Sequence, residues 1–119
     1  MIAILALAGC IEERDRPAPP QITFTLDRTT VRSINPPAPP DSVSGTVRVE
    51  DSDGLDSIWV SVDSVQDGED GGFERTFSAP YRFAIGPGKP ATTHIPIRFR
   101  ARDVAGFEVS RDTHVVVVP

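Results

Sequence analysis

The sequence predicts an all-β fold, in which seven or eight short strands form an antiparallel β-sandwich of two sheets. Twelve prolines and nine glycines argue against long helices and for many turns. Apolar and polar residues alternate with a period of two in several stretches, and no segment carries a helical period. The single cysteine excludes an intramolecular disulfide, so we expect the packing of one core to hold the fold together.

Each expected strand is marked by this alternation or by a run of valine, isoleucine or phenylalanine between turn-forming residues. In chain order the expected strands are 22–26, 43–49, 58–63, 73–77, 81–85, 95–102, 107–109 and 114–118. The prolines within 36–40 lack the N–H that a strand ladder needs. We therefore expect that segment to lie at a sheet edge or to cross between the sheets.

Two turn motifs resemble those of the immunoglobulin-like domains of bacterial surface proteins. In segment 45–63 a strand ends in an acidic turn, Asp53-Gly54-Leu55, and the next strand begins at once. Segment 97–106 ends in Ala-Arg-Asp-Val-Ala-Gly, with Phe107 in place of the asparagine that usually follows. The resemblance covers roughly residues 43–118 and implies an immunoglobulin-like sandwich domain over 22–119. Such domains serve as spacers, adhesion modules or accessory binding modules, and the fold does not choose among these roles.

The N-terminus resembles the signal and lipobox of bacterial lipoproteins. A short apolar run, 1–9, ends in Leu7-Ala8-Gly9, and the only cysteine, Cys10, follows directly. The run is shorter than the ~20 residues that cross a bilayer. The resemblance implies that 1–9 is a signal peptide, cleaved before Cys10, whose thiol then carries lipid. The basic residues that normally precede such a run are absent, which a start codon placed too late would explain; the alternative is a stray cysteine in an apolar terminus.

The segment that follows the cysteine, 10–21, is charged and then proline-rich, which is typical of an extended tether. The lipoprotein resemblance places the protein in the bacterial cell envelope, with the membrane as its partner through the lipid. Ile11 stands where an aspartate favours retention in the inner membrane of Gram-negative cells, so the outer membrane is the expected address if the cell has one. Nucleic acid is not expected as a partner of an exported chain with a net charge of −5.

The charges are segregated along the chain. Residues 50–74 contain nine acidic side chains and no basic one, whereas 75–102 contain six basic side chains and no acidic one. The favoured interpretation is that the two blocks face each other across strands. Arg98, Arg100 and Arg102, at a spacing of two, share one sheet face. They are candidate contacts for anionic glycan or phosphate groups, although neighbouring acids are expected to neutralise them.

Acidic residues near two of the turns suggest a calcium site. A site pooled from neighbouring loops would use four carboxylates: Glu50, Asp51, Asp53 and Asp103. An EF-hand is excluded, because Val62 stands where its twelfth position needs a glutamate. The favoured alternative is that these aspartates cap their own turns and that the fold needs no cofactor. His94 and His114 lack companions at ligand spacing, so zinc is not expected.

Trp59 alternates with inward residues and should point outward, as a candidate contact for sugar or protein. Antibody-like domains bury the tryptophan of this strand, so a one-residue slip that buries Trp59, or a loop that covers it, is the favoured expectation. The sequence contains no nucleophile elbow, phosphate loop or cysteine nucleophile, and we expect no enzyme. The expected function is structural or protein-binding. A carbohydrate-binding module is the main alternative, and a calcium-dependent adhesion module is a weaker one.

Overall fold

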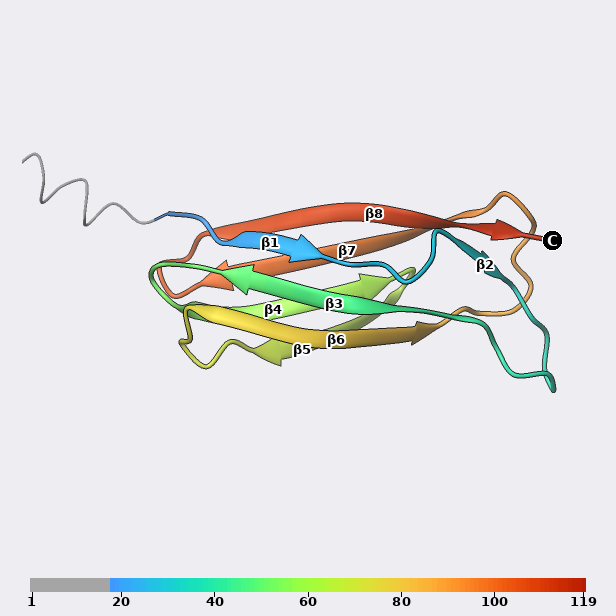
Figure 1. Cartoon of the computed structure of the whole chain (residues 1–119), viewed down its shortest axis with the longest axis horizontal. Helices are drawn as coiled ribbons and strands as arrows, with labels where there is room; N and C mark the ends of the chain where they lie inside the picture. The colour runs from blue at the N-terminus through green and yellow to red at the C-terminus, as the bar shows by residue number, and fades with distance from the viewer. Residues whose placement is uncertain (1–17) are drawn as a thin grey trace, which may run out of the picture.

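The computed structural model describes residues 18–119, which form eight strands in two sheets packed face to face (Figure 1). The expected signal peptide, Cys10 and most of the tether lie outside the described residues. The strands are β1 (Gln21–Phe24), β2 (Thr30–Arg32), β3 (Ser42–Glu50), β4 (Leu55–Val62), β5 (Val65–Asp70), β6 (Thr76–Ala84), β7 (His94–Asp103) and β8 (Glu108–Val118). The predicted all-β sandwich is therefore confirmed.

The strand order is that of an immunoglobulin-like sandwich. One sheet has the order β1-β3-β6 and the other the order β2-β8-β7-β4-β5. The first corresponds to an A-B-E sheet, and the second to a C-F-G sheet with a C′ strand, β5, added at one edge and the short strand β2 at the other. Every pairing is antiparallel except that of β2 with β8, which is parallel. The expectation of an antiparallel sandwich holds for all pairs but this one.

The period-two alternation places the core between the sheets. In β7 the residues at every second position, from Ile95 to Asp103, are buried, and β4 buries Ile58, Val60 and Val62 in the same way. Phe99 is fully buried at the centre, with its ring stacked on Phe24 at 4.5 Å between centroids. These contacts replace the disulfide that antibody domains place between their sheets.

The strands differ from the expected ones at several places, and the expected strands 73–77 and 81–85 form one strand, β6, that begins at Thr76. β5 is fully exposed and acidic and β2 has only three residues, so neither shows the alternation that marks a strand. The two segments expected at 107–109 and 114–118 form one strand, β8, because the polar residues between them continue the ladder with β7. Phe73 lies in a turn with a φ of 60°, not in a strand, and its side chain is exposed.

The proline-rich segment 36–40 connects β2 of one sheet to β3 of the other, as predicted for a crossover. The described chain enters β1 at one end of the strands, and the C-terminus lies at the opposite end (Figure 1). The entry end also holds the β3–β4 turn, the β5–β6 loop and the β7–β8 loop, and we call it the tether end. Within 18–119 the structure contains no helix of the length and apolarity needed to cross a membrane.

Candidate metal centre and outer sheet face

Three aspartates from two loops meet at the tether end. Asp51 directly follows β3, Asp53 lies in the β3–β4 turn, and Asp103 is the last residue of β7. One carboxylate oxygen of each lies within 4.8 Å of the others. The two loops are joined by a hydrogen bond of 3.0 Å, which the Val104 N–H donates to the Gly54 carbonyl. The cluster therefore brings together the end of β3 in one sheet and the end of β7 in the other.

Two of these aspartates cap their turns, as the favoured interpretation of the sequence expected. Asp51 Oδ2 accepts the Asp53 N–H at 3.0 Å, and Asp103 Oδ1 accepts the Phe107 N–H at 2.8 Å. The other oxygens, Asp51 Oδ1 and Asp103 Oδ2, are buried and have no hydrogen-bond partner among the described residues. The two residues are only 6% and 1% exposed, respectively. Burial of a carboxylate oxygen without a hydrogen-bond partner is unfavourable. Turn capping therefore accounts for only one of the two oxygens in each carboxylate.

The electrostatics of the cluster follow from its geometry. Burial raises the pKa of the Asp51 carboxyl, and the nearby charges of Asp103 and Asp53 raise it further. Asp53 itself is exposed, which leaves one side of the cluster open to solvent. Glu50, the fourth residue of the set expected from the sequence, does not join it. Its carboxylate is exposed and accepts a hydrogen bond from the Arg48 guanidinium at 2.7 Å.

The outer face of β7 carries the three arginines, and acids of β8 neutralise two of them. Arg98 pairs with Asp112 at 2.7 Å and Arg100 with Glu108 at 3.4 Å, whereas the described residues provide Arg102 with no ion pair. Neutralisation by neighbouring acids is thus confirmed for two of the three positions. An anionic ligand would have to compete with these carboxylates.

The acidic block 50–74 and the basic block 75–102 do face each other across strands, because β4 pairs with β7, but few of their charges form ion pairs. Within its bounds β4 carries a single acid, Asp56, and it separates the acids of β5 from the arginines of β7. Among the ion pairs of residues 18–119, only that of Lys89 with Asp63, at 2.6 Å, joins the blocks. The sequence offered no way to see that β8 supplies the counter-charges.

Trp59 lies on the outer face of β4 and is half-buried. The guanidinium carbon of Arg100 stands 4.5 Å from the centroid of the tryptophan ring. Gly68, opposite Trp59 on β5, leaves room for the ring, because a Cβ there would lie 3.1 Å from ring atom Cδ1. The expected slip does not reach Trp59, because the register shift in β4 falls between Leu55 and Ser57, ahead of the tryptophan. The ring is partly covered, by an arginine and not by a loop.

The strand register also brings together two histidines that the sequence separates by twenty positions. The rings of His94 on β7 and His114 on β8 stack at 4.5 Å between centroids, and both side chains are exposed. Only knowledge of the β7–β8 register could have revealed the pair. No third metal ligand accompanies these rings within residues 18–119, so they do not form a zinc centre.

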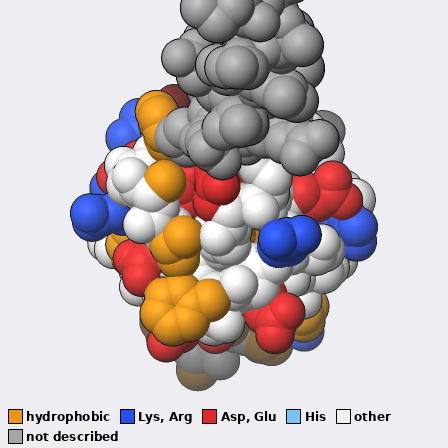
Figure 2. Space-filling model, turned by 90° about the vertical axis from the view of Figure 1, so that its left-hand side faces the viewer, with side chains coloured by type: hydrophobic (Ala, Val, Ile, Leu, Met, Phe, Trp, Pro, Cys, Tyr) orange, Lys and Arg blue, Asp and Glu red, His pale blue; other side chains and the backbone are white. Residues whose placement is uncertain are grey.

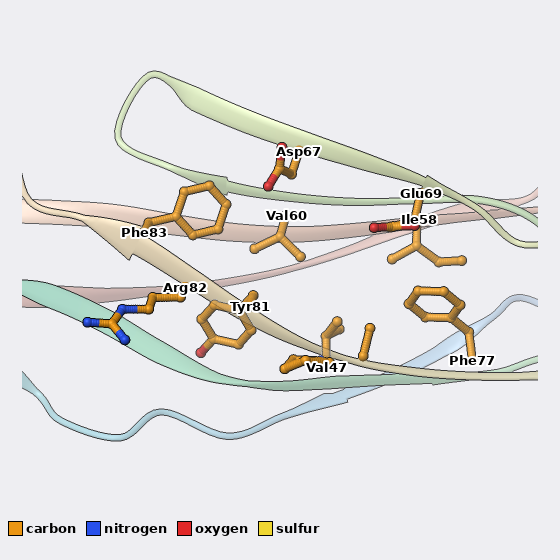
Figure 3. A pocket seen from close by; sticks show the side chains of 11 residues that line it. Val47, Ile58, Val60, Asp67, Glu69, Phe77, Tyr81, Arg82 and Phe83 are labelled. Carbon is orange, nitrogen blue, oxygen red and sulfur yellow. The ribbon is translucent and has the colours of Figure 1, made fainter.

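A groove opens between the free edges of the two sheets, where β5 and β6 lie across from each other (Figure 3). Its floor is apolar and includes Ile58, Val60 and Phe83. Asp67 and Glu69 stand at its rim, since β5 pairs them with Val60 and Ile58, respectively. Residues directly opposite each other in an antiparallel pair share a face, so these two acids lie on the inner face of the sheet edge.

No family model and no curated protein sequence matches the chain. Among solved structures, the fold is similar to the crystal structure of Spo0M, a sporulation control protein from Bacillus subtilis, with a TM-score of 0.57 and 13% sequence identity. The match covers 86% of this chain and 50% of Spo0M, so the chain spans half the length of that protein. At this identity the similarity shows the fold alone.

Proposed function

We propose that the chain is a lipoprotein of the bacterial cell envelope, anchored through lipid on Cys10, whose immunoglobulin-like domain has a structural or protein-binding role. The Leu7-Ala8-Gly9-Cys10 motif and the proline-rich segment after it support the anchor. That segment leads into β1 at Gln21, at one end of the strands. A membrane at this end would leave the C-terminal end of the sandwich pointing away from the lipid.

The observation that carries the protein-binding role is a group of exposed apolar side chains at the tether end. Phe73, Val104 and Phe107 are 74%, 47% and 43% exposed. Phe73 lies in the β5–β6 loop and the other two in the β7–β8 loop. Figure 2, which faces this end, shows apolar side chains beside acidic ones. Exposed phenylalanine is enriched at interfaces between proteins and is unfavourable in water, so a partner surface here would stabilise it.

The β3–β4 turn holds the two apolar loops together. Gly54 has a φ of 103°, and a Cβ at this position would lie 2.8 Å from the Phe73 carbonyl oxygen. The Gly54 carbonyl in turn accepts the Val104 N–H. A substitution at Gly54 would therefore disturb both loops, whereas the exposed apolar side chains can be changed without touching the core.

A carbohydrate-binding role is the weaker candidate. Asp56, Ser57 and Asp70 line an open hollow beside Trp59, where polar groups could meet a sugar. Sugar binding on tryptophan uses the face of the ring, and Arg100 lies over the Trp59 ring. A sugar would have to displace a guanidinium that also contacts Glu108. This competition favours the protein-binding role.

The anchor is tested by metabolic labelling with an alkyne fatty acid in a bacterial host, followed by membrane fractionation. Wild-type protein should take up label and sediment with membranes, and Cys10→Ser should lose both properties. A wild-type protein that is unlabelled and soluble would contradict the proposal.

The binding surface is tested in the same cells with a photo-crosslinking residue at position 73. A matched control carries it at Ser110, which is exposed on the outer face of β8. We expect a discrete cross-linked protein from position 73 and none from position 110. Equal cross-linking at both positions in a labelled, membrane-bound protein would contradict the binding surface at the tether end. The proposal of a lipid anchor would still stand.

A further inference from the structure

We propose that Asp51, Asp53 and Asp103 bind a calcium ion at the tether end of the sandwich. The inference is independent of the lipid anchor, since every residue that it uses belongs to the folded domain. Once the turns are capped, one carboxylate oxygen of Asp51 and one of Asp103 remain without a hydrogen-bond partner among the described residues.

Two buried oxygens need a partner that the described protein atoms do not supply. Asp51 Oδ1 and Asp103 Oδ2 accept no hydrogen bond, although the other oxygen of each carboxylate accepts the capping N–H. None of the ion pairs among residues 18–119 involves the three aspartates. Three carboxylates whose oxygens approach within 4.8 Å repel one another unless a positive charge lies between them. A cation supplies that charge and satisfies both orphaned oxygens.

The ligand set favours calcium among the common divalent ions. All three protein ligands are carboxylates, which are hard oxygen donors, whereas zinc prefers nitrogen and sulfur. Calcium accepts six to eight oxygens in a flexible geometry, and magnesium demands a near-ideal octahedron. The exposed side of the cluster at Asp53 can admit water to complete such a shell. Extracellular modules bind calcium with dissociation constants on the order of 0.1–1 mM, and we expect an affinity in this range here.

Bound calcium would connect the two sheets at this end. Asp51 and Asp53 follow β3 of the three-stranded sheet, and Asp103 ends β7 of the five-stranded sheet. Val104 and Phe107, in the loop that follows Asp103, would be held in place together with it. Calcium should therefore stabilise the sandwich and order the apolar surface at the tether end.

The test is thermal unfolding of the full chain, expressed without export so that Cys10 stays unmodified. Melts are recorded in about 10 mM calcium chloride, in the same concentration of magnesium chloride, and in chelator with sodium chloride at matched ionic strength. Calcium should raise the melting temperature by roughly 5 °C or more relative to chelator, and magnesium by clearly less. Coincident melts in calcium and chelator would overturn the proposal, and an equal shift in magnesium would overturn the assignment of the ion.

Three variants separate a metal site from simple turn caps. Asp51→Asn and Asp103→Asn keep an oxygen that can accept the capping N–H but remove a buried charge. Without calcium each should melt at or above the wild-type temperature, because the repulsion is relieved, and each should lose the calcium-induced rise. Asp53→Asn, at an exposed position that leaves the core untouched, should weaken calcium binding at least tenfold by isothermal titration.

The matched control is Glu50→Gln, which removes an adjacent carboxylate that pairs with Arg48 outside the cluster. It should keep the full calcium shift. A loss of the shift in Glu50→Gln as large as in Asp53→Asn would mean that calcium acts through general charge screening, and would overturn the site.

Discussion

The Tyr81 hydroxyl donates a hydrogen bond to the backbone carbonyl of Thr25. Tyr81 lies on β6 and Thr25 follows β1, so the bond reaches across β3, which lies between them. Gly45 is the residue on β3 opposite Tyr81, and its missing side chain leaves the path open. Burial, with a smaller contribution from the charge of Asp27, raises the pKa of Tyr81 to about 12, so the hydroxyl keeps its proton at physiological pH.

Removal of this hydroxyl should destabilise the domain modestly. Tyr81→Phe keeps the ring, which packs edge-to-face on Phe99, and loses only the hydrogen bond. We expect a loss of about 1 kcal/mol in the free energy of unfolding, measured by urea titration. An unchanged midpoint would show that water replaces the bond at no cost.

Gly45→Ala should be more damaging than Tyr81→Phe. A Cβ at position 45 would overlap the Thr25 carbonyl oxygen and lie 2.7 Å from the Tyr81 hydroxyl oxygen, so the backbone must move. We expect a loss of about 3 kcal/mol, at the upper end of overpacking effects. Because alanine also breaks the hydrogen bond, the two changes should be non-additive in the double variant. Full additivity would contradict a shared contact.

The inward acids of β5 should keep the domain monomeric. Asp67 and Glu69 lie at the rim of the groove, at the free edges of the sheets. Charged side chains that point inward on an edge strand oppose edge-to-edge association with another chain. Asp67→Thr, which favours a strand and removes the charge, should shift the protein toward dimers or larger species in sedimentation velocity.

The matched control for this change is Asp70→Thr, which removes one charge from the same strand on its outer face, opposite Ser57. It should leave the monomer unchanged. Equal association of both variants would mean that net charge, not the position of the acid, prevents assembly.

Stability should fall in acid through the carboxylates that tie the β1–β2 segment to β3. Hydrogen bonding from the Ser44 N–H lowers the pKa of Asp27 below 3.8, with a further contribution from Arg28. Burial opposes the shift at Asp41, but the N–H groups of Arg32 and Ser42 and the charge of Arg28 lower its pKa as well. A depressed folded-state pKa contributes stability that is full above the unfolded value and is lost as the pH falls through the folded value.

Asp27→Asn measures this contribution directly. The variant should be less stable than wild type near pH 7, and the gap should close as the pH falls below about 3.8, where the wild-type carboxylate becomes protonated. Melting temperatures of both proteins along a pH series would show it. A gap that stays constant into strong acid would contradict the depressed pKa.

The core of the sandwich could be predicted from the sequence, and its edges could not. Alternation in β4 and β7 identified the buried faces because both strands have one apolar and one polar side. β5 has no continuous apolar face, since two of its three inward positions are acids at an open edge, and β2 is too short for a period to show. The alternation of apolar and polar residues thus identifies strands that bury one face, and strands that bury little cannot be predicted from it.

The candidate site shows the same division. The motifs pointed to Asp51, Asp53 and Asp103 through turn chemistry, and the structure brings these residues together. Glu50, adjacent to Asp51 in the sequence, stays outside the cluster because strand alternation turns it outward toward Arg48. The counter-charges of the β7 arginines, and the histidine pair, depend on the β7–β8 register, which no local pattern determines.

Mass spectrometry of the N-terminal tryptic peptide can decide whether lipid on Cys10 anchors this sandwich to a membrane. The protein is recovered from the membrane fraction of cells that export it. We expect a peptide of residues 10–14, which begins at Cys10 and carries a diacylglycerol thioether with a further acyl group on the new amino terminus. A peptide that still includes residues 1–9, with a free thiol on Cys10, would contradict the claim.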